Sequence, residues 1–411
     1  MTSEVRLSRR ELLRAAAAGS VAAGLAACGR ASPTPSSTRV GPSAIPSAVF
    51  ATPAPSPSPL ATTPSPSSDP VALRARIARM LIVGFRGLEI GAADPITKAL
   101  AGGLGGVILF DRDQTTGGRR NVASPRQLAA LTASLRAAAA GPLLIALDQE
   151  GGRVSRLNPV MGFPATKTQA AIGATDDPAV ARAAGRAMGA TMAAAGIDLD
   201  LAPIVDVNVN PKNAAIGALE RSFSADPSVV AALAQAEIEG LHESGVRATL
   251  KHFPGLGSAA ANTDFAVVDV TKTWTDTELE PFETLIGAGL PDAIMTGNIL
   301  NRTLDPDRPA SLSAATVDGL LRTRLGWAGV VVTDDLDAVA VTSRFKRSEA
   351  VALAIEAGND LLLFANQATY VPDLADALID TIMGHVASGR IAEARIDAAN
   401  ARIAMAAGAP R

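Results

Sequence analysis

Residues 143–153 read Leu-Leu-Ile-Ala-Leu-Asp-Gln-Glu-Gly-Gly-Arg. Five apolar residues run directly into an acidic segment that ends in a glycine pair. A continuous apolar run of this length is typical of a strand that is buried on both faces of a parallel sheet. Polar groups that follow such a strand indicate functional residues at its carboxyl end. We therefore expect an α/β protein whose chemistry lies where parallel strands end.

The same pattern recurs through the rest of the chain. Segments such as Pro178–Ala195, Pro227–Ser244 and Ser348–Ala357 separate the apolar runs and are typical of helices. Eight strand-then-helix units predict a TIM (β/α)8-type barrel, forming a single catalytic domain over residues 71–411. The alternative is a doubly wound open sheet, but no Gly-x-Gly-x-x-Gly follows the first strand and no phosphate loop is present. The predicted strands are Leu81–Phe85, Gly106–Phe110, Leu143–Asp148, Leu199–Val207, Ala248–Phe253, Ala293–Asn298, Val330–Asp334 and Asp360–Ala365.

The first 28 residues have the order of an export signal. A twin-arginine sequence at residues 8–10 precedes an apolar run over residues 12–27, and Cys28 follows. The run is too weakly apolar for a permanent membrane helix, which needs about 20 strongly apolar residues. The ending Leu-Ala-Ala-Cys at residues 25–28 is typical of a lipobox. We therefore expect cleavage before Cys28 and lipid attachment to its sulfur.

Residues 29–70 are predicted to form a disordered tether. Residues 31–70 hold eleven of the 27 prolines, interleaved with Ser, Thr and Ala. Such a segment cannot bury enough apolar surface to order itself, and Pro-rich spacers extend by about 3.1 Å per residue. We expect an exported protein on the extracytoplasmic face of the cell membrane, attached to it only through the lipid on Cys28.

The composition excludes several classes of function. The formal charge is −3, so the chain lacks the basic balance that a nucleic-acid partner needs. One Cys and three scattered His argue against a disulfide framework and against a metal site, and we expect no metal and no cofactor. Aromatic residues make up only 3% of the chain, which argues against a long groove that grips a carbohydrate polymer.

Polar residues follow five consecutive predicted strands. They include Asp148 after the third, Asp206 after the fourth, Lys251-His252 in the fifth, Asn298 after the sixth and Asp334 after the seventh. A single Asp in such a place is usually a helix cap or an ion-pair partner. Five strands that end this way, without a set of metal ligands, favour a polyhydroxylated ligand, because carboxylates accept from hydroxyls and cationic groups donate to oxygens.

Five segments resemble the signature segments of family-3 glycoside hydrolases. The most similar branch is the single-domain bacterial β-N-acetylglucosaminidases (β-hexosaminidases) of cell-wall turnover. The segments are Asp148–Val154, Ala202–Asn208, Arg221–Phe223, Lys251–Gly255 and Val332–Leu336. They occur in the family's order, and the resemblance extends over about residues 72–410. It implies a retaining, exo-acting enzyme that releases terminal N-acetylglucosamine from small cell-wall-derived glycosides.

The resemblance also implies roles for individual residues. Asp334 matches the nucleophile, an ionised carboxylate that attacks the anomeric carbon. We expect the neighbouring Asp335 to point away and to cap or pair, because side chains alternate along a strand. Five residues match those that hold the sugar hydroxyls and the 2-acetamido group in the family, namely Asp148, Arg156, Arg221, Lys251 and His252.

The sequence departs from the family in the loop after the fifth strand. Members of the similar branch carry an Asp and a His here, two residues apart, and this dyad protonates the leaving oxygen. In the present chain the corresponding residues are Asn262 and Asp264. The other histidines are predicted to lie in helices, so none of them replaces the dyad histidine.

Three interpretations of this departure remain open. In the first, Asp264 is itself the general acid/base, with a pKa raised by burial or by the charge of Asp334. A hydrogen bond from Asn262 to the Asp264 carboxylate would oppose that shift. In the second, only good leaving groups are released, or Asp111, Asp113 or Glu150 supplies the proton. In the third, the protein is a sugar-binding lipoprotein with little turnover. A β-glycosidase or phosphorylase of different sugar specificity is a further alternative, although an anionic Asp264 would repel phosphate.

Overall fold

The computed structural model describes residues 69–408. The predicted export signal, Cys28 and nearly all of the predicted tether lie outside these residues. The first described helix, α2 (Pro70–Ala78), begins at a proline and is capped by Asp69, whose Oδ1 accepts a hydrogen bond from the Val71 N–H at 3.0 Å. A proline suits this first position because its missing N–H has no partner within a helix in any case.

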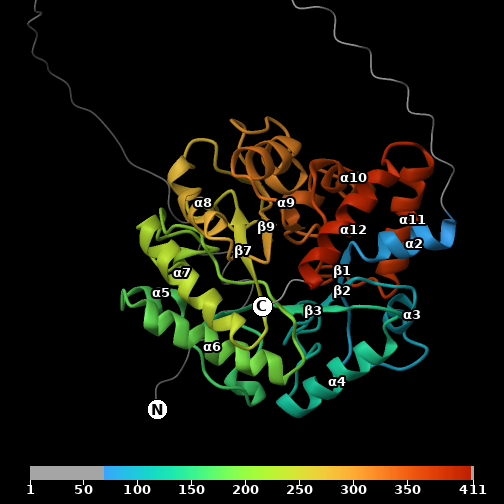
Figure 1. Cartoon of the computed structure of the whole chain (residues 1–411), viewed down its shortest axis with the longest axis horizontal. Coiled ribbons are helices and arrows are strands. Elements are labelled where there is room, and N and C mark those ends of the chain that lie inside the picture. Colours follow the sequence, from blue (N-terminus) through green and yellow to red (C-terminus); the bar gives the residue numbers. More distant parts are fainter. Residues whose placement is uncertain (1–68, 409–411) are drawn as a thin grey trace, which may run out of the picture. The chain divides into compact units, whose positions relative to one another are not determined.

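Eight parallel strands form the sheet at the centre of the molecule (Figure 1). Their order is that of the sequence, and the parallel bridge between Val332 and Leu361 joins the last two strands, so that the sheet closes nearly completely. The predicted TIM-barrel fold is confirmed. The strands are β1 (Leu81–Gly84), β2 (Gly106–Ile108), β3 (Leu144–Leu147), β6 (Leu199–Asp200), β7 (Arg247–Phe253), β9 (Ala293–Thr296), β11 (Val330–Thr333) and β12 (Leu362–Phe364).

Helices surround the strands (Figure 1). Several begin with an Asp-Pro or Ser-Pro pair, and in α6 the Asp177 carboxylate accepts the Ala179 N–H at 2.8 Å. Such caps satisfy N–H groups that have no partner within the helix. After α2, the helices are α3 (Pro95–Ala101), α4 (Pro125–Ala138), α5 (Gln169–Gly173), α6 (Pro178–Ala194), α7 (Pro227–His242), α8 (Glu280–Gly287), α9 (Val339–Thr342), α10 (Arg347–Ala357), α11 (Leu374–Ala387) and α12 (Glu393–Gly408).

Several shorter elements lie outside the eight-stranded sheet. Strands β4 (Gln149–Gly151) and β5 (Val154–Ser155) form an antiparallel pair, and β8 (Val268–Asp269) pairs in parallel with β10 (Ile299–Leu300). A π-helical segment covers Ala315–Arg324. Four short 3-10 segments complete the secondary structure of the described residues, at Pro159–Met161, Gly217–Leu219, Asp276–Glu278 and Ala310–Leu312.

The strands are buried on both faces, which explains their continuous apolar runs. In β1, Ile82 belongs to the cluster inside the barrel, whereas Leu81 and Val83 pack outward under the helices. Helix α12 closes the amino-terminal end of the barrel, where the Ala406 carbonyl accepts a hydrogen bond from Arg247 at 3.1 Å. With that end filled, the carboxyl ends of the strands are the side on which a ligand can reach polar groups.

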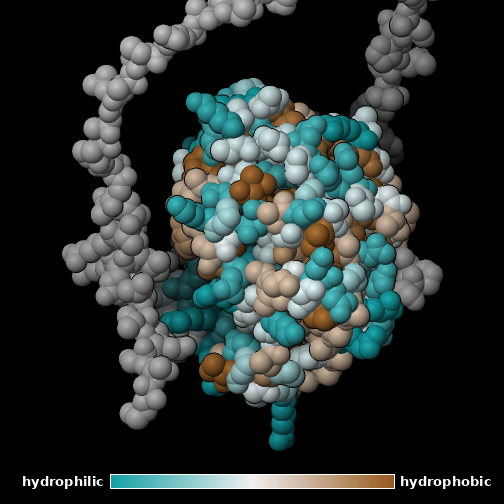
Figure 2. Space-filling model, turned by 90° about the vertical axis from the view of Figure 1, so that its left-hand side faces the viewer, coloured by the Kyte–Doolittle hydropathy of each residue, from teal (hydrophilic) through white to brown (hydrophobic). Residues whose placement is uncertain are grey.

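The face that carries α5 to α8 shows apolar residues only in small groups between hydrophilic ones (Figure 2). Within residues 69–408, no helix has both the length and the apolar character that crossing a membrane requires.

Two buried carboxyl groups lie between β6 and α7. Asp200 and Glu237 are both fully buried. The Asp200 Oδ1 atom accepts the Gln149 N–H at 2.9 Å, but its Oδ2 atom and both Glu237 carboxyl oxygens find no hydrogen-bond partner among residues 69–408. Burial raises the pKa of Asp200 to about 8, and burial together with Asp200 raises the pKa of Glu237 well above its ordinary value. Asp200 is therefore expected to be neutral at pH 7, and burial favours the neutral form of Glu237 as well.

The Asp200→Asn variant is expected to have a flatter dependence of stability on pH than the wild type. The folded-state pKa lies above the unfolded value near 3.9, so the folded protein keeps a proton that the unfolded chain loses, and stability falls as the pH rises from about 4 to about 8. Between about pH 5 and pH 8, the wild type should lose roughly 2–4 kcal/mol relative to the variant. Urea denaturation at both pH values measures this difference, and parallel curves would contradict the assignment.

Candidate active site

The segment after β3 forms a tight hairpin beside the barrel. Gly151 and Gly152 adopt positive φ angles of 90° and 56°. A side chain at Gly151 would also collide with the backbone, because its Cβ would lie 2.3 Å from the Lys167 carbonyl oxygen. The glycine pair therefore permits the turn that keeps Asp148 and Glu150 close to the strand ends.

Four of the five predicted sugar-binding residues form one network with Glu150. The Lys251 Nζ atom lies 2.8 Å from Asp148 Oδ1 and 2.6 Å from Glu150 Oε1. Arg156 Nη2 lies 3.0 Å from the other Asp148 oxygen. Arg221 binds Glu150 with two hydrogen bonds, of 2.6 and 2.7 Å. We call these five residues the ionic cluster. They come from three separate parts of the chain, which the barrel brings together.

The charges of the ionic cluster stabilise one another. Burial acts against the ionised form of Glu150, but Arg221 and Lys251 outweigh it and lower the pKa to about 2. Burial is likewise outweighed at Asp148, where Lys251 and Arg156 lower the pKa, and at Lys251, where Asp148 and Glu150 raise the pKa. The cluster therefore stays charged at neutral pH and offers fixed donors and acceptors to a hydroxylated ligand.

His252 is held by a carboxylate that the sequence analysis did not assign to the site. Its Nδ1 atom lies 2.7 Å from Asp206 Oδ2, and Asp206 Oδ1 accepts the N–H groups of His252 at 3.2 Å and Leu256 at 2.7 Å. Asp206 is fully buried. An acceptor at Nδ1 fixes the orientation of the ring and leaves the Nε2 side for a ligand. The signals in the sequence were the place of Asp206 after a strand and its membership of the family-like segment Ala202–Asn208.

Asp334 lies directly after β11. Its N–H donates to the Thr296 carbonyl at 2.9 Å, and its Oδ1 atom accepts the Asp335 N–H at 2.7 Å. The Asp335 carboxylate instead accepts the N–H groups of Ala365 at 3.0 Å and Asp337 at 3.1 Å, so it caps the backbone as expected. Asp335 thus holds the backbone of two other residues, and Asp334 remains the predicted nucleophile.

Asp264 is close enough to Asp334, Arg221, His252 and Asp148 for their charges to act on its carboxyl group. The residue as a whole is exposed, but the protein around its carboxyl group desolvates it, and this effect together with the charge of Asp334 raises the pKa of Asp264. The Asn262 side chain does not donate to that carboxylate. Its Oδ1 atom accepts the Asp264 backbone N–H at 2.8 Å, so it shapes the turn, and the opposing hydrogen bond considered above is absent.

The loop that carries Asp264 is attached at both ends. The Ala340 N–H donates to the Thr263 carbonyl at 3.1 Å, which ties the loop to the segment after Asp334. At the start of the loop, the buried Glu278 carboxylate accepts the Ser258 N–H at 3.2 Å. Burial raises the pKa of Glu278 to about 7. The sequence analysis missed Glu278, which lies in a helical segment outside any recognisable motif.

Two of the other carboxylates considered as proton donors are poor candidates. Asp113 lies 2.7 Å from Arg86 and 2.8 Å from Arg120. Although burial opposes its ionisation, hydrogen bonds from Arg86 and Thr116 lower its pKa. Glu150 is occupied in the ionic cluster. Asp111 lies 3.8 Å from an Arg156 nitrogen. Among these carboxyl groups and Asp264, only Asp264 combines proximity to Asp334 with a raised pKa.

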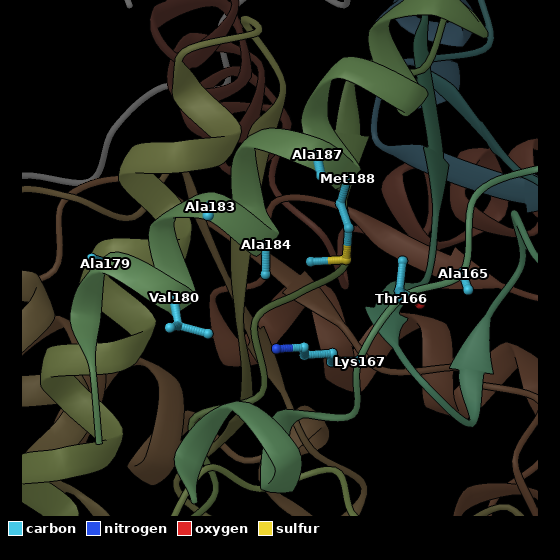
Figure 3. Close-up of a pocket in the computed structure, with 9 residues that line it drawn as sticks. All are labelled: Ala165, Thr166, Lys167, Ala179, Val180, Ala183, Ala184, Ala187 and Met188. Atoms are coloured by element: carbon cyan, nitrogen blue, oxygen red, sulfur yellow. The ribbon is translucent and has the colours of Figure 1, made fainter. Parts of the chain in front are cut away.

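A hollow of about 470 Å³ lies elsewhere, on the outside of the barrel (Figure 3). It is lined by the α6 residues Val180, Ala184 and Met188 and by Thr166 and Lys167, among others. Its lining includes no carboxylate and none of the predicted site residues.

The Glycosyl hydrolase family 3 N terminal domain model matches residues 72–406. This chain belongs to glycosyl hydrolase family 3. A protein named β-hexosaminidase from Xylella fastidiosa is 37% identical over 314 residues, which cover 74% of this chain and 87% of the relative. A protein of the same name from Tolumonas auensis is 38% identical over 284 residues, which cover 67% and 79%. The present chain is therefore a glycoside hydrolase.

Solved structures of similar proteins agree with this assignment. A family-3 β-N-acetylglucosaminidase from a Paenibacillus species has a TM-score of 0.74 and 36% identity, over 81% of this chain and 62% of the longer Paenibacillus protein. A β-N-acetylhexosaminidase from Beutenbergia cavernae has a TM-score of 0.73 and 34% identity, over 82% of this chain and 98% of that protein.

Replacing Glu150 with Gln should strongly destabilise this glycoside hydrolase. Glu150 is 1% exposed, and the change leaves the buried charges of Arg221 and Lys251 without one of their partners. Breaking a buried ion pair costs about 3–5 kcal/mol. The loss is measured as the free energy of unfolding in urea at pH 7.

Glu243→Gln is the matched control. Glu243 also contacts two arginines, Arg182 and Arg186, but at the surface. Solvent screens such pairs, so this variant should unfold nearly as the wild type does. Equal losses of unfolding free energy in the two variants would show that burial does not increase the contribution of the ionic cluster to stability.

Proposed function

We propose that the protein is a retaining, exo-acting β-N-acetylhexosaminidase that releases terminal N-acetylglucosamine from small glycosides derived from the cell wall. Asp334 is the nucleophile and Asp264 the general acid/base. The observation that carries this proposal is that the loop of Asp264 is hydrogen-bonded to the segment after Asp334, where burial and the charge of Asp334 raise the pKa of Asp264. The names of the relatives support an N-acetylhexosamine as the sugar, and the name of the Paenibacillus protein supports N-acetylglucosamine.

In the first step, the Asp264 carboxylic acid donates its proton to the glycosidic oxygen while Asp334 attacks the anomeric carbon. The bond to the aglycone breaks, and a glycosyl ester forms on Asp334. In the second step, the Asp264 carboxylate takes a proton from water, which displaces Asp334 and regenerates both groups. Two displacements at the same carbon give net retention.

The ionic cluster provides the binding side of this proposal. Arg156, Lys251 and Asp148 are positioned to bind sugar hydroxyls, and the buried Arg156 Nε atom has no hydrogen-bond partner within the described residues. His252 presents an imidazole that Asp206 holds in place. Donors fixed before the ligand arrives lose little entropy on binding, which favours tight binding of a distorted sugar ring.

The Asp264→Asn variant tests the role of the acid. The amide cannot donate the proton, so kcat/KM for an unactivated N-acetylglucosaminyl disaccharide should fall about 10²–10⁴-fold. An aryl N-acetylglucosaminide with an activated leaving group needs little protonation and should lose less than about tenfold. Steady-state kinetics with both substrates measure the contrast.

Asp334→Asn is the reference variant, because loss of the nucleophile should abolish turnover of both substrates. Equal losses on the two substrates in Asp264→Asn, or no loss, would refute the acid role. A wild type that binds N-acetylglucosamine and hydrolyses neither substrate would favour the sugar-binding lipoprotein instead.

We also propose that the protein is exported and held at the extracytoplasmic face of the membrane by a lipid on Cys28. The support is the order of residues 1–28, in which a twin-arginine sequence and an apolar run lead into the only cysteine of the chain. Two or more acyl chains are enough for stable anchoring.

Replacing Cys28 with Ser should move the protein from the membrane fraction to the soluble fraction, because the lipid can no longer be attached. Fractionation of cells, together with incorporation of labelled palmitate, measures this. Asp264→Asn provides a control that should remain in the membrane fraction. An unchanged distribution and an unlabelled wild type would each contradict lipid anchoring.

A further inference from the structure

Exposed apolar side chains gather on the loops around Asp334 and Asp264. Four of them follow the carboxyl ends of β6, β7 and β11: Val209 is 46% exposed, Phe265 65%, Val267 43% and Val339 39%. Exposed large hydrophobic residues are common when scattered singly. A group on adjoining loops beside a site of chemistry calls for a different explanation.

Backbone hydrogen bonds join the segments that carry three of these residues. The Val339 N–H donates to the Asp264 carbonyl at 3.4 Å, and the next N–H along the chain donates to the Thr263 carbonyl. Val339 is therefore joined to the short segment that carries Phe265 and Val267. We call Phe265, Val267 and Val339 the apolar rim.

Phe265 is the most exposed aromatic residue among residues 69–408. Its N–H donates to the Asn262 carbonyl at 3.1 Å, so the ring is carried by an ordered turn. A ring that is 65% exposed contributes little to the core, and the chain has only ten Phe, two Trp and one Tyr in all. Its exposed face is available to a ligand.

The position of Phe265 relative to Asp264 decides which part of a ligand it can meet. Consecutive Cα atoms are about 3.8 Å apart, so Phe265 adjoins the residue that protonates the glycosidic oxygen. That oxygen is the boundary between the cleaved sugar and the aglycone. In the proposed function the ionic cluster, which is polar and mostly buried, binds the cleaved sugar. The apolar rim is therefore left for the aglycone.

We propose that the apolar rim is the aglycone-binding surface of the enzyme, and that it holds the next sugar ring of the substrate by stacking the ring's C–H face on Phe265. This inference rests on the proposed hydrolase function. The side chains of the rim offer few hydrogen-bonding groups, so they contact the apolar face of the aglycone sugar. The rim therefore discriminates little between sugars that differ only in the arrangement of their hydroxyl groups. One ring provides one platform, which suits short fragments.

The test compares a substrate with an aglycone sugar and one without. For Phe265→Ala, kcat/KM on an N-acetylglucosaminyl disaccharide should fall about tenfold, the loss expected when one stacking contact is removed. N-acetylglucosaminyl fluoride places only the cleaved sugar in the site and releases fluoride, so its kcat/KM should stay within about twofold of the wild type. Phe265→Trp keeps an aromatic face and should retain activity on the disaccharide.

Met405→Ala is the matched control. Met405 is 64% exposed, nearly as much as Phe265, but it lies on α12 at the opposite end of the barrel. This variant should match the wild type on both substrates. A loss in Phe265→Ala that is equal on the two substrates, or no loss on either, would overturn the inference.

Two further outcomes separate this inference from its premise. If the wild type hydrolyses neither the disaccharide nor the fluoride, the proposed function fails. If the wild type is active and Phe265→Ala instead reduces binding to anionic phospholipid vesicles with disaccharide kinetics unchanged, the apolar rim is a membrane contact and the aglycone role is refuted.

Discussion

The ammonium group of Lys251, placed between the carboxylates of Asp148 and Glu150, is the interaction on which the active site depends. Its distances to them are 2.8 and 2.6 Å, and the Lys251 side chain is only 2% exposed. A buried charge is stable only if its partners are also in place. The segment after β3 and strand β7 must therefore meet in one register, and Arg221 extends the same requirement to the segment after β6. The groups proposed to bind the sugar are also the groups that hold the carboxyl face of the barrel together.

Proton transfer is organised differently from binding. The ionic cluster keeps its groups charged through opposite charges, whereas desolvation and the charge of Asp334 both disfavour ionisation of Asp264 and raise its pKa. Glu150 and Asp264 thus lie in one site, but their surroundings favour the ionised form of Glu150 and the protonated form of Asp264. The loop of Asp264 is hydrogen-bonded to the segment after Asp334, so the positions of the proposed acid and the proposed nucleophile are linked through the backbone. The same bonds join Val339 of the apolar rim to that loop.

The strands were predictable because each is buried on both faces and so leaves a continuous apolar run. Seven of the eight predicted segments contain a strand of the barrel, and the fifth, Ala248–Phe253, misses only the first residue of β7. The fourth was predicted to extend from Leu199 to Val207, but its ladder covers only Leu199–Asp200, with one further bridge at Ile204. Pro203 has no N–H to donate, so an unbroken ladder could not pass through it. The apolar composition predicted where the fourth strand lies, whereas backbone hydrogen bonding determined the residue at which strand pairing ends.

The sequence by itself determined the fold class, the order of the strands and the residue types available at their ends, because these follow from local patterns along the chain. The tertiary structure alone decided which of those residues meet. Lys251 lies 103 positions from Asp148, and His252 lies 46 positions from Asp206. It also decided that the Asn262 side chain caps the backbone of Asp264 and leaves its carboxyl group free. Such pairings depend on closure of the barrel, which sets distances and burial that no single stretch of sequence contains.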